Sequence, residues 1–288
     1  MFAHDFVRNA YLAGTFIALA CGVVGWFVVL RAQVFAGDAL SHVAFVGAIA
    51  AAVVGLDTRV GLYGLTLGLA LAMAALGRRA QPDDVVIGTV FTWILGLGIL
   101  MITLLSTSSS GGEGITAVNT LFGSIYSLGA GASRVASVIA VAVVLCLAAI
   151  FRPLLLATLD PVLASIRGVR VRLLGAVFLV LLAIVSAEST EAVGALLLLG
   201  LLAAPAGAAH RVTARPGRGL ALSGLIAVGS MWGGLALAYA IPALPPSSAI
   251  VALAAGSYGA AAGLTRDSGA GRRSGRRAVR GPDRRRPA

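Results

Sequence analysis

Lysine is absent from this chain of 288 residues, and all 22 basic residues are arginines. A standard phosphate-binding loop, Gly-x-x-x-x-Gly-Lys-Ser/Thr, is therefore excluded, and the chain carries no nucleotide site of that kind. Charge of either sign is also scarce: charged residues make up 11% and hydrophobic residues 59%, whereas a soluble domain has about 25% charged residues. This composition excludes an ordinary water-soluble globule and predicts an all-α polytopic membrane protein.

Cysteine is nearly absent as well. Cys21 and Cys146 both fall inside apolar runs, where a free thiol behaves as a small hydrophobic side chain. We therefore expect neither a disulfide nor a metal–thiolate site.

Long apolar runs are abundant, and most approach the roughly 20 residues that cross a bilayer. They predict nine spans in a single bundle, near residues 10–30, 39–56, 60–77, 85–105, 133–151, 173–187, 192–210, 219–241 and 247–264. Eight spans are the alternative, because the run at 173–187 is short and would have to tilt, extend into Glu188 or stop part-way. The sequence thus predicts one transmembrane domain over residues 1–264.

The arginines gather on alternate connections between these runs. Arginine-rich connections follow the runs that end near residues 77, 151 and 210, whereas 106–132, 188–191 and 242–246 carry little positive charge. Since positive charge marks cytoplasmic loops, we expect a multi-pass membrane protein with an external N-terminus and a cytoplasmic C-terminus.

Residues 265–288 differ from the rest of the chain in being rich in Arg, Gly, Ser and Pro. This segment has nine arginines against Asp267 and Asp283, which gives it +7 of the chain's formal charge of +11. We expect a disordered cytoplasmic tail that either binds anionic membrane lipid or is simply solvated. Nucleic-acid binding is not expected, because no folded basic surface with interleaved aromatics accompanies the charge.

The most informative polar residues are Asp38 and His42, in Gly37-Asp38-Ala39-Leu40-Ser41-His42. At a spacing of four their side chains share one face of a helix, with Ser41 beside them. A carboxylate and an imidazole can form half of a site for a divalent transition metal, and ionisable residues inside a membrane are functional candidates. The alternatives are that Asp38 caps the helix start and that His42 is a satisfied interior histidine. A buried turn over residues 33–37 would place the pair deeper in the membrane.

Two other segments stand out. Asp160 and Pro161 predict a helix start, and Gly168 predicts its end, so a short amphipathic helix over about 159–168 would lie on the cytoplasmic side. It would lie on the lipid surface or dock a soluble partner. Pro205 interrupts an apolar run and predicts a kink, which would serve either packing or gating.

Several of these segments together carry a family resemblance. They are, in chain order, Phe27-Val28-Val29-Leu30-Arg31, Gly37-Asp38-Ala39-Leu40-Ser41-His42, Leu121-Phe122-Gly123-Ser124-Ile125, Asp160 with Gly168-Val169, and Val193-Gly194-Ala195 leading to Pro205-Ala206. The pattern resembles the permease subunits of bacterial ATP-binding-cassette importers of zinc, manganese and iron, over about residues 6–264. The stretch at 203–208 and the acidic Glu188 and Glu191 depart from the family pattern, which leaves the substrate preference open.

The resemblance implies a homodimeric, multi-pass permease of the bacterial plasma membrane that is not itself an enzyme. It implies two copies of a cytoplasmic ATPase docked through the short helix at Asp160, Pro161 and Gly168, and metal delivered by an extracytoplasmic solute-binding protein. Asp38 and His42 would contact the transported zinc, manganese or iron, and no permanently bound cofactor is expected. The alternatives are a permease for iron chelates or cobalamin-like ligands and a gradient-driven carrier. A carrier would need a series of titratable groups, for which Asp38, His42, Glu188, Glu191 and His210 are the candidates.

Overall fold

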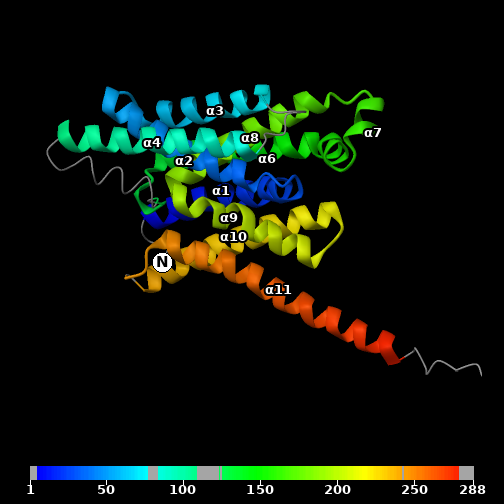
Figure 1. The fold of residues 1–288 in the computed structure, drawn as a ribbon. Helices are drawn as coiled ribbons and strands as arrows, with labels where there is room; N and C mark the ends of the chain where they lie inside the picture. Colours follow the sequence, from blue (N-terminus) through cyan, green and yellow to red (C-terminus); the bar gives the residue numbers. More distant parts are fainter. Residues whose placement is uncertain (1–4, 77–83, 109–122, 124, 242, 279–288) are drawn as a thin grey trace, which may run out of the picture.

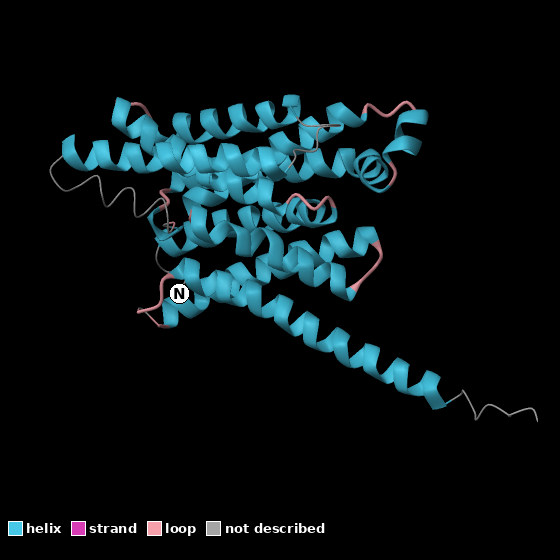
Figure 2. Cartoon of the chain, viewed as in Figure 1, coloured by secondary structure: helices cyan, strands magenta, loops and turns pink. Residues whose placement is uncertain are grey.

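The protein is a bundle of long helices, described here from a computed structural model (Figure 1). The structure describes residues 5–76, 84–108, 123, 125–241 and 243–278, and the regular secondary structure in these ranges is helical (Figure 2). The helices are α1 (Asp5–Leu30), α2 (Val34–Val54), α3 (Thr58–Leu76), α4 (Asp84–Ser108), the 3-10 turn η1 (Ile125–Ser127), α6 (Ala130–Leu159), α7 (Pro161–Ile166), α8 (Val171–Ala192), α9 (Ala195–Val212), α10 (Pro216–Ala240) and α11 (Pro246–Ala278).

Each of the nine predicted spans falls on one long helix, and η1 and the short α7 lie between spans. Seven helices are long and apolar enough to cross a membrane, and α4 and α9 contain shorter apolar segments, Ile87–Met101 and Leu198–Val212. The short run at 173–187 lies within α8, which continues through Glu188 to Ala192. The expectation of an all-α, multi-pass membrane protein is therefore confirmed.

The first helix forms the centre of the bundle. It packs against α6, α8, α9 and α10, while α2 packs against α3, α4, α8 and α9. The long helices run in roughly the same direction, and the C-terminal part of α11 extends away from the bundle at an angle (Figure 1). Because α1 is surrounded, its second half is buried almost without interruption from Ala20 to Val28.

Small residues allow the closest helix contacts, as expected where helices associate by van der Waals packing in lipid. A Cβ atom on Gly25 of α1 would collide with the Leu202 carbonyl of α9, and one on Gly61 of α3 would collide with the Gly47 carbonyl of α2. By contrast, a Cβ on Gly64 would meet nothing within 4 Å. The close contact of α3 with α2 is therefore made at Gly61 and not at Gly64.

The turn between α1 and α2 is tighter than the sequence predicts. Ala32 adopts a left-handed conformation with a φ of 54°, the Gln33 amide donates to the Val28 carbonyl, and α2 begins at Val34. The hypothesis of a buried turn over residues 33–37 is therefore wrong, because residues 34–37 already belong to the helix.

The last helix extends beyond the predicted boundary at residue 264. It continues to Ala278, so the structure gives helix, and not disorder, to the first part of the predicted tail. The five arginines among residues 265–278 favour a helix, whereas the three glycines there oppose it. Residues 279–288 lie outside the described residues, and the division into bundle and tail stays a prediction.

The ends of the bundle differ in charge. The N-terminus lies at one end and α7 at the other (Figure 1). The connections around α7 carry Arg167 and Arg170, while Arg78, Arg79 and most of the connection at 106–132 lie outside the described residues. This alternation agrees with an external N-terminus, which stays a prediction.

Candidate functional site

Asp38 lies in the second turn of α2, not at its start. The residue before the helix is Gln33, whose side chain makes no capping hydrogen bond. Because Asp38 is inside the helix, its carboxylate is too far along the chain to cap the first amides. The hypothesis that Asp38 is a helix cap is therefore wrong.

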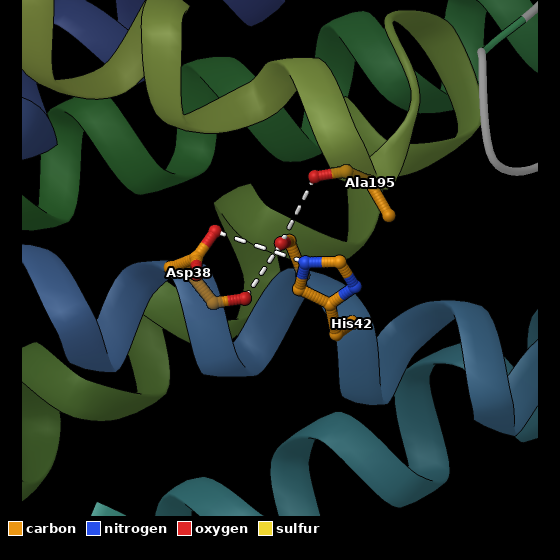
Figure 3. A network of polar contacts seen from close by, with 4 residues as sticks. Asp38, His42 and Ala195 are labelled. Atoms are coloured by element: carbon orange, nitrogen blue, oxygen red, sulfur yellow. Dashed lines mark hydrogen bonds and ion pairs between the residues drawn. The ribbon is translucent and has the colours of Figure 1, made fainter. Parts of the chain in front are cut away.

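Asp38 and His42 face one another along α2 (Figure 3). The His42 Nε2 atom lies 3.9 Å from the Asp38 Oδ1 atom, and the two side chains are 13% and 22% exposed respectively. This separation is too long for a hydrogen bond. Among the described residues neither side chain has a hydrogen-bond partner, so both keep their lone pairs available.

Three other helices shape the surroundings of the pair. The Phe91 ring of α4 packs edge-on against the His42 imidazole, with ring centroids 5.2 Å apart. The buried Ser41 hydroxyl lies 2.7 Å from the Asp38 carbonyl oxygen and 3.2 Å from that of Ala195, the first residue of α9 (Figure 3). Gly37, one residue before Asp38, lies close to Leu182 of α8 and Leu202 of α9. The pair therefore sits where α4, α8 and α9 approach α2.

The start of α9 depends on Gly194. Its φ of 98° and ψ of 152° fall in a region that only glycine adopts readily. This conformation separates α8 from α9 and brings the Ala195 carbonyl to Ser41. A Cβ on Gly123, from the segment before η1, would collide with Val193, so that segment packs directly on the break between α8 and α9.

The donor atoms suit part of a metal shell. With metal–ligand distances of about 2.1 Å, two adjacent ligands lie about 3.0 Å apart in an octahedron and about 3.4 Å apart in a tetrahedron. The observed 3.9 Å would need to shorten by less than 1 Å. No group of three or more His, Cys, Asp or Glu side chains that could hold a metal occurs among the described residues, so the pair would supply two ligands of an incomplete shell.

The predicted short helix is present as α7. Asp160 caps it, since its Oδ1 atom accepts a hydrogen bond of 2.9 Å from the Leu163 amide, and Pro161 is its first residue. Gly168 follows the helix with a φ of 76°, as expected for a glycine after a C-terminus. The side chains of Val162 and Ile166 are 59% and 76% exposed, which leaves an apolar surface at this end of the bundle.

The remaining ionisable candidates do not join the Asp38–His42 pair. Glu191 forms an ion pair of 2.8 Å with Arg59 of α3, and Glu188 is buried one turn earlier on α8. His210 lies in the last turn of α9, where its Nε2 atom is 3.0 Å from the Trp26 carbonyl oxygen. Within the described residues no hydrogen bond or ion pair connects these groups to Asp38 or His42. The connected series that a gradient-driven carrier would need is not formed there.

Pro205 lies inside α9 and is buried. It removes one backbone donor from the middle of that helix, and the kink expected from it stays a prediction.

Sequence reasoning missed Phe91, the Ala195 carbonyl and Arg59 as neighbours of the candidate residues. Nothing in the local sequence marks Phe91 or Arg59, because only the packing of α2 with α4 and of α3 with α8 brings them to their partners. The motif Val193-Gly194-Ala195 was a usable signal for Ala195, since a glycine between two apolar helices indicates a backbone break.

Comparison with known proteins gives related transport proteins. The model of a family described as the ABC 3 transport family matches residues 3–262. The chain is 30% identical over 217 residues to the manganese transport system membrane protein MntC of Halalkalibacterium halodurans, covering 75% of this chain and 72% of the relative. It is also 30% identical over 207 residues to the manganese import system permease protein ScaB of Streptococcus parasanguinis, covering 71% of each.

A solved structure shares the fold over most of its length. The structure of PsaBC from Streptococcus pneumoniae in complex with Fab superposes with a TM-score of 0.78 at 26% sequence identity, covering 90% of this chain and 91% of that one.

Proposed function

This chain belongs to the ABC 3 transport family, whose model matches residues 3–262, and from that premise we propose that it is the membrane-spanning permease subunit of an ATP-driven importer of divalent transition-metal ions. The observation that carries the proposal is the Asp38–His42 pair, an unbonded carboxylate and imidazole on one face of a helix within a membrane bundle. An incoming divalent ion would contact both side chains, while water or a second protomer completes its shell.

Manganese is the metal best supported by the relatives, because two of them at 30% identity are named as manganese transport or import proteins. The donor set also accepts zinc and ferrous iron, since imidazole and carboxylate suit all three ions. A site with two protein ligands binds weakly, and a transport site must release its ion. The pair favours a bare metal ion over an iron chelate or a cobalamin-like ligand, which would call for a large apolar cavity without metal ligands.

Energy for transport would come from a separate cytoplasmic ATPase, because a chain without lysine has no standard phosphate-binding loop. The capped helix α7, with Val162 and Ile166 exposed at the end of the bundle, is the proposed docking element for that ATPase. Two permeases would form a homodimer with alternating access. An extracytoplasmic solute-binding protein would deliver the metal at the opposite end of the bundle, and no permanently bound cofactor is needed.

The test is uptake of radioactive manganese, zinc and iron into vesicles that contain the permease, its ATPase and its solute-binding protein. We expect ATP-dependent uptake by the wild type. Asp38→Asn keeps the size of the side chain but removes the charge that attracts a cation, and His42→Ala removes the nitrogen ligand. Both variants should lower uptake about tenfold or more, the effect of losing one charge-assisted contact.

Uptake is normalised to inserted permease, which separates loss of transport from loss of folded protein. Ser109→Ala, in the connection predicted to lie outside, serves as a control and should transport normally. Near-normal uptake by both Asp38→Asn and His42→Ala would exclude a role for this pair in the metal pathway.

A further inference from the structure

Arg31 connects three parts of the molecule that are far apart in the sequence. It lies in the turn between α1 and α2, directly after Leu30. Its Nη1 atom donates a hydrogen bond of 3.2 Å to the Thr158 hydroxyl of α6, and its Nε atom donates one of 3.2 Å to the Gln33 Oε1 atom. Its guanidinium carbon also lies 5.2 Å from the centroid of the Phe178 ring of α8.

The charge of Arg31 is partly buried without an acidic partner. Among the described residues no ion pair involves its side chain, so the guanidinium is held only by neutral acceptors and an aromatic face. Burial lowers the pKa of the Arg31 guanidinium below its ordinary value, yet a guanidinium stays charged in proteins. A buried cation held this way must be placed accurately, because each lost hydrogen bond leaves charge without compensation.

Each neutral partner lies next to a functional element. Thr158 is two residues before Asp160, the cap of α7, and its hydroxyl also donates to the Leu154 carbonyl of α6 at 2.7 Å. Gln33 precedes α2, and its carbonyl accepts a hydrogen bond of 3.2 Å from the Gly37 amide, next to Asp38. Arg31 therefore bridges the end of α6 that leads into α7 and the start of the helix that carries the metal pair.

Gln33 suggests that this bridge has a second arrangement. Its side-chain amide nitrogen is buried and has no hydrogen-bond partner in the part of the chain that the structure describes. Buried polar atoms normally have a partner, so the present arrangement of the turn leaves this amide nitrogen unsatisfied. Movement can be transmitted between two sites when the contact that joins them has two packed arrangements.

We infer that Arg31 is a positioning residue that couples movement of the docking helix α7 to the start of α2 and so to the metal pair at Asp38 and His42. The inference rests on the proposed function and adds the residue through which the ATPase would act on the metal site. When a partner moves α7, Thr158 at the end of α6 moves with it. The Arg31 guanidinium, which is hydrogen-bonded to both Thr158 and Gln33, then transmits that displacement to Gln33 and to the first turns of α2.

The test compares manganese moved per ATP hydrolysed in vesicles that contain the complete complex of permease, ATPase and solute-binding protein. Thr158→Val has nearly the shape of threonine but accepts no hydrogen bond, whereas Thr158→Ser keeps the hydroxyl. We expect Thr158→Val and Arg31→Gln to lower the ratio about tenfold, the effect of one lost hydrogen bond to a charged group. Thr158→Ser should keep the wild-type ratio, and the ATPase should copurify with all variants.

Arg172→Gln is the matched control. Arg172 lies at the start of α8, and its Nη2 atom donates to the Ala75 carbonyl at 3.2 Å in an exposed contact, so its loss should leave the ratio unchanged.

A wild-type ratio in both Arg31→Gln and Thr158→Val would overturn the inference. The inference would also be overturned if uptake by these variants fell only in proportion to the amount of inserted permease. If Arg31→Gln does not insert, the comparison of Thr158→Val with Thr158→Ser decides. A wild-type complex that moves no metal would instead contradict the proposed function itself.

Discussion

At the residue scale, Asp38 and His42 show how the bundle accommodates ionisable side chains. Both are partly shielded, at 22% and 13% exposed, and neither side chain has a hydrogen-bond partner within the described part of the chain. Keeping a carboxylate inside a membrane protein without a fixed partner costs stability. A carboxylate and an imidazole held in this state are open to a mobile cation, which is the property a transport pathway needs.

Gly25 lies at a position where no side chain fits, because α1 and α9 pack closely there. We predict that Gly25→Ala destabilises the protein by about 1–3 kcal/mol or more, because its methyl group would collide with the Leu202 backbone where α1 meets α9. The measurement is the midpoint of thermal unfolding of the purified protein in detergent.

Gly64→Ala is the matched control, since a Cβ there would meet nothing within 4 Å. It should leave stability unchanged or raise it by up to about 1 kcal/mol, because alanine favours a helix over glycine. Equal destabilisation by both changes would show that the close contact between α1 and α9 is not the reason why Gly25→Ala destabilises the protein.

At the element scale, α7 joins α6 to α8 at one end of the bundle. Its cap at Asp160, its proline at position 161 and Gly168 after its end are all local features. They make a six-residue helix that packs on α6 through the buried Ala164 and leaves its other face uncovered. Such a helix is stable only when anchored, which suits a contact point for another subunit.

We predict that Ile166→Asp prevents binding of the ATPase while the permease still inserts. Ile166 is 76% exposed, so aspartate is tolerated in the free permease, but a charge buried in an apolar contact would be costly. The measurement is copurification of the ATPase with tagged permease, together with metal-stimulated ATP hydrolysis.

Ser165→Ala is the control for that experiment. The Ser165 hydroxyl only donates to the Val162 carbonyl at 2.7 Å on the exposed surface of α7, so its loss should leave binding intact. Copurification of normal amounts of ATPase with Ile166→Asp would show that the partner docks elsewhere.

At the scale of the whole molecule, the chain crosses between two ends of unlike charge. Arginine-rich connections lie at the end with α7, and the N-terminus lies at the other end, together with the turn from α2 to α3 (Figure 1). Because positive charge is retained in the cytoplasm, the end with α7 should face inwards.

We predict that a cysteine at position 57 reacts with an impermeant maleimide in intact cells and that one at position 165 does not. The two variants are Asp57→Cys, in the exposed turn between α2 and α3, and Ser165→Cys, in α7. Cys146 would first be changed to Ala, whereas Cys21 is completely buried and can remain. The reverse labelling pattern would invert the orientation and with it the proposed docking of a cytoplasmic ATPase to α7.

Much of this architecture could be predicted from the sequence because its causes are local. Apolar runs long enough to cross a bilayer predicted nine helices, and Asp160, Pro161 and Gly168 predicted both ends of α7. The spacing of Asp38 and His42 placed their side chains on one helix face. The start of α2 was misjudged, because Asp38 resembles a cap and nothing in the local sequence shows that the helix already begins at Val34.

Other features were decided only by the tertiary structure, because they depend on which helices pack together. The approach of Phe91 to His42, the contact of Ser41 with the Ala195 carbonyl, the pairing of Arg59 with Glu191 and the bridge from Arg31 to Thr158 each join residues of different elements. Helix formation follows from hydrogen bonds within one segment, and membrane insertion follows from its apolar length. The partners of a polar side chain follow instead from how helices distant in the sequence pack together, which no local pattern records.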